Sequence, residues 1–185
     1  MKRLSHACLF FFVLLAGGLV LTSCDLASAG STVILNAGSP IPPTVQHRFE
    51  YTRDDVTEGG TVDVVSTVES DGLDAILSEN GFRRSDVVSA RVDSVLVEPV
   101  SAVSLSAAAL YLGTDANGPR IADVEFPSGS PSPVLDASLQ VVTGAVRAGA
   151  SNVFARFRAD DPSNIPSGGG VVRARVYYRV EVEGI

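Results

Sequence analysis

The C-terminal part of the chain contains the stretch Val172-Arg173-Ala174-Arg175-Val176-Tyr177-Tyr178-Arg179-Val180-Glu181-Val182, and this stretch decides the fold class. Every even-numbered position in it is apolar or aromatic, whereas the odd-numbered positions carry arginine, tyrosine or glutamate. Because successive side chains of a β-strand point to opposite faces, the alternation predicts a strand with one packed and one solvent-exposed face. Such strands are typical of antiparallel sheets. A one-residue slip would bury the arginines and is therefore disfavoured.

The same alternation recurs along most of the chain after Thr44, where valine is abundant. Runs of this kind predict half-buried strands. The predicted strands are Thr44–Tyr51, Thr61–Val68, Ser89–Val97, Ala107–Leu112, Ile121–Phe126, Asn152–Ala159 and Val171–Val182, with a brief strand-like segment at Val33–Leu35. Residues 114–119 are predicted to form a hairpin loop, because the asparagine and glycine in it tolerate positive φ.

Two segments depart from simple alternation. In Ser89–Val97 the apolar phase slips between Val92 and Val95, and a bulge near Ser94 would return both halves to one core face. The segment Val134–Gly149 also fits a helical period, and we interpret it as a strand followed by a turn.

One short helix is predicted, with an apolar stripe made of Leu73, Ile76 and Leu77. Ser70 or Asp71 would cap its N-terminus, and Asn80-Gly81 would end it. Roughly eight or nine strands with so little helix favour an all-β fold, a single antiparallel β-sandwich domain. This domain is predicted to span residues 44–185.

The N-terminus has the three parts of a secretory signal peptide. Lys2 and Arg3 precede an apolar run from Ala7 to Leu21, which ends in the tetrapeptide Leu21-Thr22-Ser23-Cys24. The run of about 15 residues is shorter than the roughly 20 that a helix needs to span a bilayer. An ordinary signal peptide cleaved near Ala27 or Ala29 is one interpretation of this pattern.

The tetrapeptide 21–24 resembles the lipobox of bacterial lipoproteins. The resemblance implies that Cys24 becomes the first residue of the mature chain and carries a diacylglyceryl group with acyl chains such as palmitate. Two or more acyl chains hold a protein stably at a membrane, whereas one holds it only marginally. We therefore expect a signal peptide over residues 1–23, a tether over residues 24–43 and a membrane-tethered domain over residues 44–185.

A lipobox, a short tether and a β-rich domain with the helix sequence Leu-Asp-Ala-Ile-Leu at 73–77 are together similar to small lipoproteins of Bacteroidota-type bacteria. The likeness covers most of the chain and implies a location in the bacterial cell envelope. It carries over one functional residue, Cys24, and implies no activity for the domain.

The mature chain would be acidic and poor in reactive side chains. Loss of Lys2 and Arg3 changes the formal net charge from −7 to −9. Nucleic-acid binding requires a basic footprint, so this charge argues against that class of partner. Lys2 is the only lysine and Cys8 leaves with the signal, so Schiff-base chemistry, Cys-His catalysis and zinc sites built from several Cys or His lack their residues. No cofactor is predicted.

His47 is the only histidine left once the signal is removed, and a Ser-His-Asp triad would depend on it. It alternates in phase with Val45, Phe49 and Tyr51, which favours a packed, structural histidine. The glycine run 168–170 lacks the Lys-Ser/Thr of a phosphate-binding loop and is predicted to be a flexible turn.

Two acidic pairs, Asp54-Asp55 and Asp160-Asp161, are the candidates for a glycosidase mechanism. Both lie in predicted loops, where acidic residues are usually solvated. Two segments are similar to fragments of a calcium loop, one with Asp115, Asn117 and Gly118 and one with Asp54, Asp55 and Glu58. Because further ligands are missing and turn formation explains both, we predict neither a metal site nor a catalytic residue.

Five arginines fall on the outward phase of the last two predicted strands. They are Arg156 and Arg158 in the first, and Arg173, Arg175 and Arg179 in the second, with Phe154 and Tyr177 on the same faces. If the two strands pair with these faces aligned, the arginines and Tyr177 form a basic patch for an anionic glycan or an envelope protein. Alternatively, carboxylates on neighbouring strands neutralise each arginine.

Two functions follow from these patterns. The leading hypothesis is a lipid-anchored, non-catalytic envelope lipoprotein with a structural, scaffold or partner-binding role. The alternative is a carboxylate-dependent hydrolase that acts on envelope glycans. The two differ in whether an acidic pair converges in a concave pocket.

Overall fold

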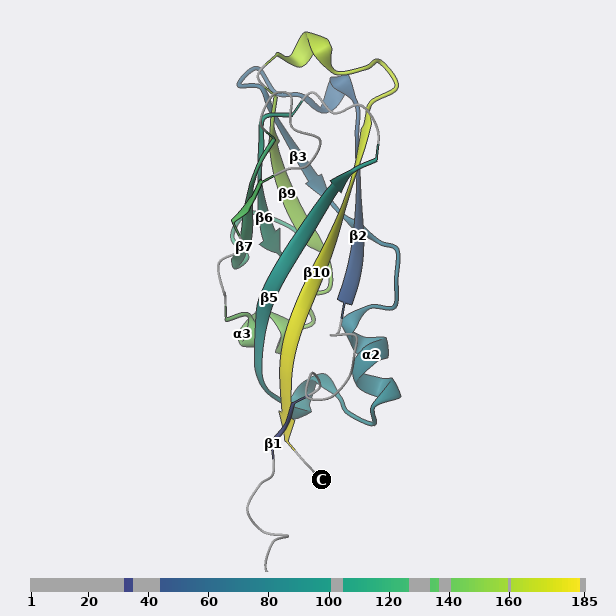
Figure 1. Ribbon diagram of the computed structural model, residues 1–185, viewed down its shortest axis with the longest axis vertical. Helices are drawn as coiled ribbons and strands as arrows, with labels where there is room; N and C mark the ends of the chain where they lie inside the picture. Colours follow the sequence, from purple (N-terminus) through teal and green to yellow (C-terminus); the bar gives the residue numbers. More distant parts are fainter. Residues whose placement is uncertain are drawn as a thin grey trace, which may run out of the picture. The chain divides into compact units, whose positions relative to one another are not determined.

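The strand β10 (Gly170–Glu183) runs through the middle of one sheet of the computed structural model (Figure 1). The structure describes residues 32–34, 44–100, 105–126, 134–136, 141–159 and 161–183, which lie in one compact unit, Thr32–Glu183. The even-numbered positions of β10 from 172 to 182 are at most 2% exposed. The alternation predicted from the sequence is therefore confirmed.

The sheet around β10 is antiparallel throughout. On one edge β10 pairs with β2 (Thr44–Tyr51) and, near its C-terminal end, with β1 (Thr32–Ile34). On the other edge it pairs along most of its length with β5 (Val87–Pro99). The two-residue strand β4 (Thr67–Val68) pairs with β2. We call this five-stranded sheet sheet A.

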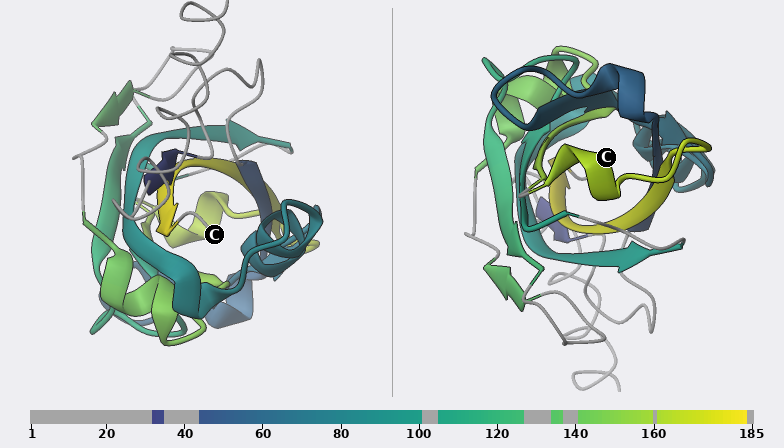
Figure 2. Two further views of the ribbon diagram at one scale, coloured as in Figure 1. Left: turned by 90° about the horizontal axis from the view of Figure 1, so that it is seen from below. Right: turned by 90° about the horizontal axis from the view of Figure 1, so that it is seen from above.

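The second sheet, sheet B, is also antiparallel and five-stranded. Its order is β3 (Thr61–Val65), β9 (Val153–Arg158), β6 (Ala107–Leu112), β7 (Arg120–Glu125) and β8 (Val134–Asp136). In the end-on views of Figure 2 the strands curve around a common interior. The predicted all-β, sandwich-type fold is thus confirmed, as are the strands flanking the loop at 114–119.

The core lies between the two sheets and contains the inward side chains of both. Phe49 of β2 and Phe157 of β9 are fully buried, and their rings meet edge to face with centroids 5.7 Å apart. Burying a large apolar side chain contributes about 1.5–3 kcal/mol, so this shared interior is the main source of stability for a chain without a pair of cysteines in the domain.

The bulge predicted near Ser94 is confirmed. Tyr177 lies opposite Ser94 and Tyr178 lies opposite Val92, so Asp93 is the additional residue in β5. The bulge reverses the phase of the strand. As a result the buried positions switch from even to odd numbers, and these positions are Ala90, Val92, Val95 and Val97.

The predicted single strand Thr61–Val68 is wrong. The chain leaves sheet B after β3 at Val65 and enters sheet A at β4, with Ser66 at the crossing point. Because the period of two continues through the crossing, the apolar pattern does not reveal the change of sheet. Ser66 itself is 5% exposed, so a polar side chain is buried where the chain crosses.

The helix α2 (Leu73–Glu79) is present as predicted, but its cap is different. Gly72 is the N-cap residue, and no side chain of the described residues forms a capping hydrogen bond at this N-terminus. The Ser70 hydroxyl instead accepts a hydrogen bond from the backbone N–H of Gln46, at 2.9 Å. Ser70 therefore ties the loop before the helix to the edge of β2.

The segment Val134–Gly149 contains a second helix, so the predicted strand and turn are only half right. The strand is β8, and α3 (Thr143–Arg147) follows it. Val142 and Val146 are buried, which explains the helical period in this segment. Leu139, which belongs to the same apolar pattern, lies outside the described residues, as do residues 127–133.

Arginines hold the ends of the sandwich together through backbone carbonyls. At one end Arg84, in the 3₁₀ helix η2 (Arg84–Asp86), pairs with Asp74 of α2 and donates to the carbonyl oxygen of Val146, at 2.6 Å. At the other end Arg53, in η1 (Arg53–Asp55), donates to the carbonyl oxygen of Ile165, at 2.9 Å, just after η3 (Pro162–Asn164). These contacts connect loops that are far apart in sequence.

Strand β1 lies within residues 24–43, which we predicted to be a tether. Thr32 and Ile34 pair with Glu183 and Glu181, so the folded domain includes residues before Thr44. The brief strand-like segment at Val33–Leu35 accounts for this pairing. Cys24 lies outside the described residues.

Candidate functional site

The predicted five-arginine patch is divided between two sheets and does not form one surface. Arg156 and Arg158 lie on β9 in sheet B, whereas Arg173, Arg175 and Arg179 lie on β10 in sheet A. β9 pairs with β3 and β6, and β10 pairs with β1, β2 and β5. The two strands do not pair, so the condition for a single five-arginine patch is not met, although both arginine sets lie on outward phases.

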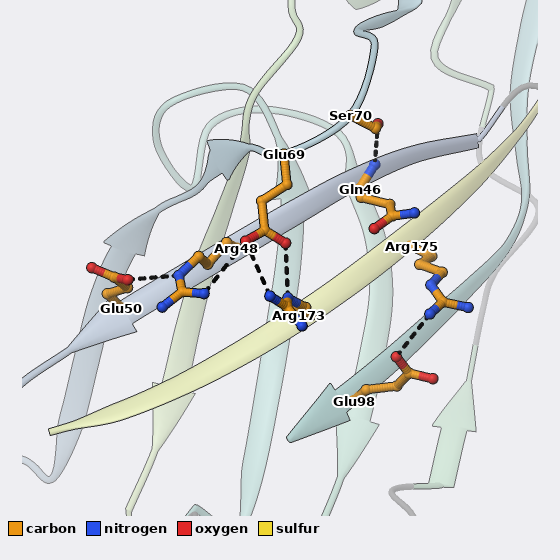
Figure 3. Close-up of polar contacts among 8 residues, drawn as sticks. All are labelled: Gln46, Arg48, Glu50, Glu69, Ser70, Glu98, Arg173 and Arg175. Atoms are coloured by element: carbon orange, nitrogen blue, oxygen red, sulfur yellow. Dashed lines mark hydrogen bonds and ion pairs between the residues drawn. The ribbon is translucent and has the colours of Figure 1, made fainter. Parts of the chain in front are cut away.

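On the outer face of sheet A, each of the three arginines of β10 has a carboxylate partner. Arg173 contacts Glu69 at 2.8 Å, Arg175 contacts Glu98 at 3.3 Å and Arg179 contacts Asp93 at 3.1 Å. Their side chains are 41–42% exposed. Figure 3 shows the first two of these contacts. Tyr177 lies on the same half-buried phase, between Thr44 and Ser94.

Glu69 neutralises two arginines that face each other across the sheet. Arg173 and Arg48 are directly opposite in the register of β10 and β2, a like-charge arrangement that destabilises a sheet. The Glu69 carboxylate accepts from Arg173 at 2.8 Å and from Arg48 at 3.4 Å (Figure 3). The hydrogen bond from Arg173 is the largest cause that holds the pKa of Glu69 below its usual range. The charge of Arg173 and the hydrogen bond and charge of Arg48 act in the same direction. Arg48 also contacts Glu50, at 2.6 Å.

Asp93 neutralises a second pair of arginines that face each other across sheet A. Arg179 lies opposite Arg91 in the register of β10 and β5. The Asp93 carboxylate lies 3.1 Å from Arg179 and 3.5 Å from Arg91. Asp93 is the additional residue of the bulge in β5, so the bulge both corrects the strand phase and places a carboxylate between two guanidinium groups.

On the outer face of sheet B, Arg156 is held by Asp63 and an aromatic ring. Two hydrogen bonds of 2.8 and 2.6 Å join the guanidinium of Arg156 to the Asp63 carboxylate. The guanidinium also lies 5.8 Å from the ring centroid of Phe154. Phe154 packs against Tyr111 and is only 7% exposed, so our expectation of an exposed Phe154 is wrong.

Arg158 lies at the other end of β9, beside a shallow depression of about 270 Å³. Glu58, Gly60 and Pro162 line the same depression. It contains one acidic and one basic side chain, and Arg158 itself is exposed. Sequence reasoning placed Arg158 with Arg156 and did not place it at this end of the sheet beside the 59–60 turn.

His47 is fully buried, as its phase predicts. Its Nδ1 lies 3.0 Å from the Ser66 hydroxyl oxygen, which also accepts from the backbone N–H of Val153, at 2.9 Å. Nε2 has no hydrogen-bond partner among the described residues. Burial lowers the pKa of His47 to about 4. A histidine with these contacts joins the two sheets and is neutral at physiological pH.

Asp55 and Asp161, one residue from each acidic pair, form hydrogen bonds within their own turns. The Asp55 carboxylate accepts from the backbone N–H of Thr52 at 2.7 Å, and that of Asp161 accepts from the N–H of Ser163 at 2.9 Å. Hydrogen bonds from Thr52 and Ser163 hold the pKa of Asp55 and Asp161 below their usual range. These carboxylates close the turns of η1 and η3, and Asp160 lies outside the described residues.

The calcium-loop fragments are also turns. The Asp115 carboxylate accepts from the backbone N–H of Asn117, at 2.8 Å, which is an Asx turn. Glycine is required at position 118, because a Cβ there would lie 2.1 Å from the carbonyl oxygen of Leu112. Among the residues that the structure describes, no three His, Cys, Asp or Glu side chains gather as a metal site.

The glycine run 168–170 accommodates Tyr51. A Cβ on Gly169 would lie 2.0 Å from the Tyr51 carbonyl oxygen, and a Cβ on Gly170 would lie 2.3 Å from the Tyr51 hydroxyl oxygen. Gly169 also has a φ of 77°, in the left-handed region. Close packing therefore explains Gly169 and Gly170, whereas Gly168 has open space around it and lies in a turn, as predicted.

Comparison with protein-family models, with curated proteins and with solved structures finds no match for this chain. Within the described ranges, no helix has both the length and the apolar character needed to cross a bilayer.

Proposed function

We propose that this chain is a lipid-anchored, non-catalytic lipoprotein of the bacterial cell envelope, with a structural, scaffold or partner-binding role. The observation that carries the proposal is the tetrapeptide Leu21-Thr22-Ser23-Cys24 at the end of an apolar run. Acyl chains on Cys24 would hold the domain at the membrane, because each buried methylene contributes about 0.8 kcal/mol.

The geometry of the charged side chains supports a structural role for sheet A. Its two cross-strand arginine pairs each have a carboxylate between them, Glu69 in one case and Asp93 in the other. Side chains arranged in this way satisfy one another's charge and stabilise the face of the sheet. An anionic partner would have to displace Glu69 or Asp93 before it could reach either pair.

The contacts of the acidic residues give the hydrolase alternative little support. A glycosidase needs one carboxylic acid that is protonated at working pH, which requires a raised pKa. Hydrogen bonds in the turns of η1 and η3 shift the pKa of Asp55 and Asp161 in the opposite direction. His47, the remaining candidate base, is enclosed in the core beside Ser66.

The anchor is tested by expressing the full chain in a bacterium and comparing Cys24→Ala with the matched control Cys8→Ala. We expect wild type and Cys8→Ala to sediment with membranes after a salt wash, and to carry acyl chains on residue 24 by mass spectrometry. Cys24→Ala should enter the soluble fraction. Sedimentation of Cys24→Ala after the wash would show that the lipid is not the attachment.

A further inference from the structure

Strand β1 defines where the chain enters the sandwich. Thr32 pairs with Glu183, and Val87, the residue directly after η2, pairs with Val182. β1, η2 and the C-terminal end of β10 therefore share one end of the domain (Figure 1). We call this the entry end.

The opposite end, which we call the far end, is formed by the start of β10 and by the turns around it. Gly170 pairs with Tyr51, the last residue of β2, and η1 follows directly. η3 lies in the loop that precedes Gly170, and Arg53 connects the two turns. With 14 residues at about 3.3 Å each, β10 separates the two ends by about 46 Å.

The distance that Cys24 can reach is shorter than this separation. Cys24 precedes Thr32 by eight positions. A fully extended chain spans at most about 3.6 Å per residue, so these eight residues cover at most about 29 Å. A lipid on Cys24 thus cannot lie against the bilayer while the domain stands on its far end.

We infer that the domain stands with its entry end toward the membrane and its far end, with η1, η3 and the depression beside Arg158, pointing away from it. This orientation rests on the proposed lipid attachment at Cys24. The envelope partner of a scaffold or binding domain would accordingly meet the far end or the sides of the sandwich.

Charge disfavours the remaining orientation, in which the domain lies flat on the bilayer. The mature chain has a formal net charge of −9, and anionic lipid headgroups repel exposed carboxylates. Four of the five arginines on the outward phases of β9 and β10 pair with carboxylates, and among the described residues Arg158, at the far end, is the one without such a partner. Neither face therefore offers a free basic surface to the lipid.

The orientation is tested with three full-length, lipidated proteins that each carry one additional cysteine labelled with a fluorophore. The exposed positions are Ser85→Cys at the entry end, Ser167→Cys at the far end and Ser94→Cys on the outer face of sheet A. Each protein is reconstituted in vesicles of phosphatidylethanolamine and phosphatidylglycerol that contain a headgroup-attached quencher. We expect quenching at Ser85 to exceed quenching at Ser167 several-fold, with Ser94 between them.

Equal quenching at all three positions, or stronger quenching at Ser94 or Ser167 than at Ser85, would overturn the orientation while the anchor stands. If mass spectrometry finds no acyl chain on residue 24, the proposed function itself fails, and the orientation fails with it. Thermal unfolding of each labelled protein checks that the fold is retained. Mass spectrometry thus detects failure of the anchor, and the quenching pattern detects failure of the orientation.

Discussion

The Nδ1 atom of His47 lies 3.0 Å from the hydroxyl oxygen of Ser66, and this buried contact lies where the chain passes from one sheet to the other. Ser66 accepts from the backbone N–H of Val153 and donates its own backbone N–H to the carbonyl oxygen of Val153. The Ser66 hydroxyl therefore makes two buried hydrogen bonds, one accepted from Val153 and one with Nδ1 whose direction depends on the imidazole tautomer. The contact thus links β2 in sheet A with β9 in sheet B.

We predict that Ser66→Ala destabilises the domain by about 2–3 kcal/mol, because it leaves the N–H of Val153 and Nδ1 of His47 buried without this partner. The measurement is the free energy of unfolding from urea titration. Ser94→Ala is the matched control, because Ser94 is exposed and surface substitutions usually change stability by at most about 0.5 kcal/mol. Equal effects of the two substitutions would show that the contact does not stabilise the core.

The burial of His47 predicts that the stability of the domain depends on pH. Burial lowers the pKa of His47 from 6.5 to about 4, so between these values the unfolded chain binds a proton that the folded chain does not. The free energy of unfolding must then decrease as the pH falls from about 6.5 toward 4, with a slope of up to about 1.4 kcal/mol per pH unit. Between pH 7.5 and pH 5 we expect wild type to lose about 2 kcal/mol.

His47→Gln isolates this effect, because glutamine does not titrate. The variant should be less stable than wild type at pH 7.5, and its stability should change little between pH 7.5 and pH 5. Asp55 and Asp161, whose pKa values are lowered, lose their contribution at lower pH in both proteins. Parallel pH profiles for wild type and His47→Gln would contradict the prediction.

The packing of Tyr51 gives a pair of predictions with opposite signs. Its hydroxyl is buried without a partner among the described residues, and burial raises the pKa of Tyr51 to about 12. Tyr51→Phe removes this unsatisfied group, so we expect unchanged or slightly higher stability, within about 1 kcal/mol. A clear loss of stability would show that the hydroxyl makes a hydrogen bond that stabilises the fold.

Gly170→Ala should have the opposite effect. Its methyl group would lie 2.3 Å from the Tyr51 hydroxyl oxygen and would push the ring against Phe157, whose centroid is 5.7 Å away. Overpacking of this kind typically costs about 1–3 kcal/mol. Gly168→Ala is the control, since nothing lies within 4 Å of a Cβ at that position. Thermal melts of the two variants decide the matter, and equal midpoints would contradict the prediction.

Local pattern was sufficient for most of the strands and for the bulge, because both depend on which side chains share a face. β10 alternates without interruption, and the phase slip in β5 has one solution that buries Val92 and Val95 together. The burial of His47 follows from the same rule. These features are encoded within single strands.

Features that depend on which strands become neighbours could not be predicted in this way. The five-arginine patch required β9 and β10 to pair, but the loop between these consecutive strands crosses from sheet B to sheet A. The crossing at Ser66 was missed because alternation is the same in either sheet. The sequence did not reveal that Arg53 and Arg84 donate to backbone carbonyls at the ends of the sandwich, because those carbonyls lie more than 60 residues away in sequence.

The last prediction concerns the carboxylate between Arg48 and Arg173. Glu69→Gln keeps the shape of the side chain but removes the charge between two guanidinium groups that lie opposite each other. We expect a lower unfolding midpoint than in wild type, with the difference largest at low ionic strength, because the Debye length shrinks from about 10 Å at 0.1 M salt to about 3 Å at 1 M. Glu50→Gln is the matched control, because within the described residues the Glu50 side chain has Arg48 as its one ion-pair partner and is 66% exposed. If repulsion between the two arginines is what Glu69 relieves, Arg48→Gln should cancel most of the effect of Glu69→Gln in a double-mutant cycle. Equal and salt-independent effects of Glu69→Gln and Glu50→Gln would instead identify Glu69 as an ordinary surface ion pair.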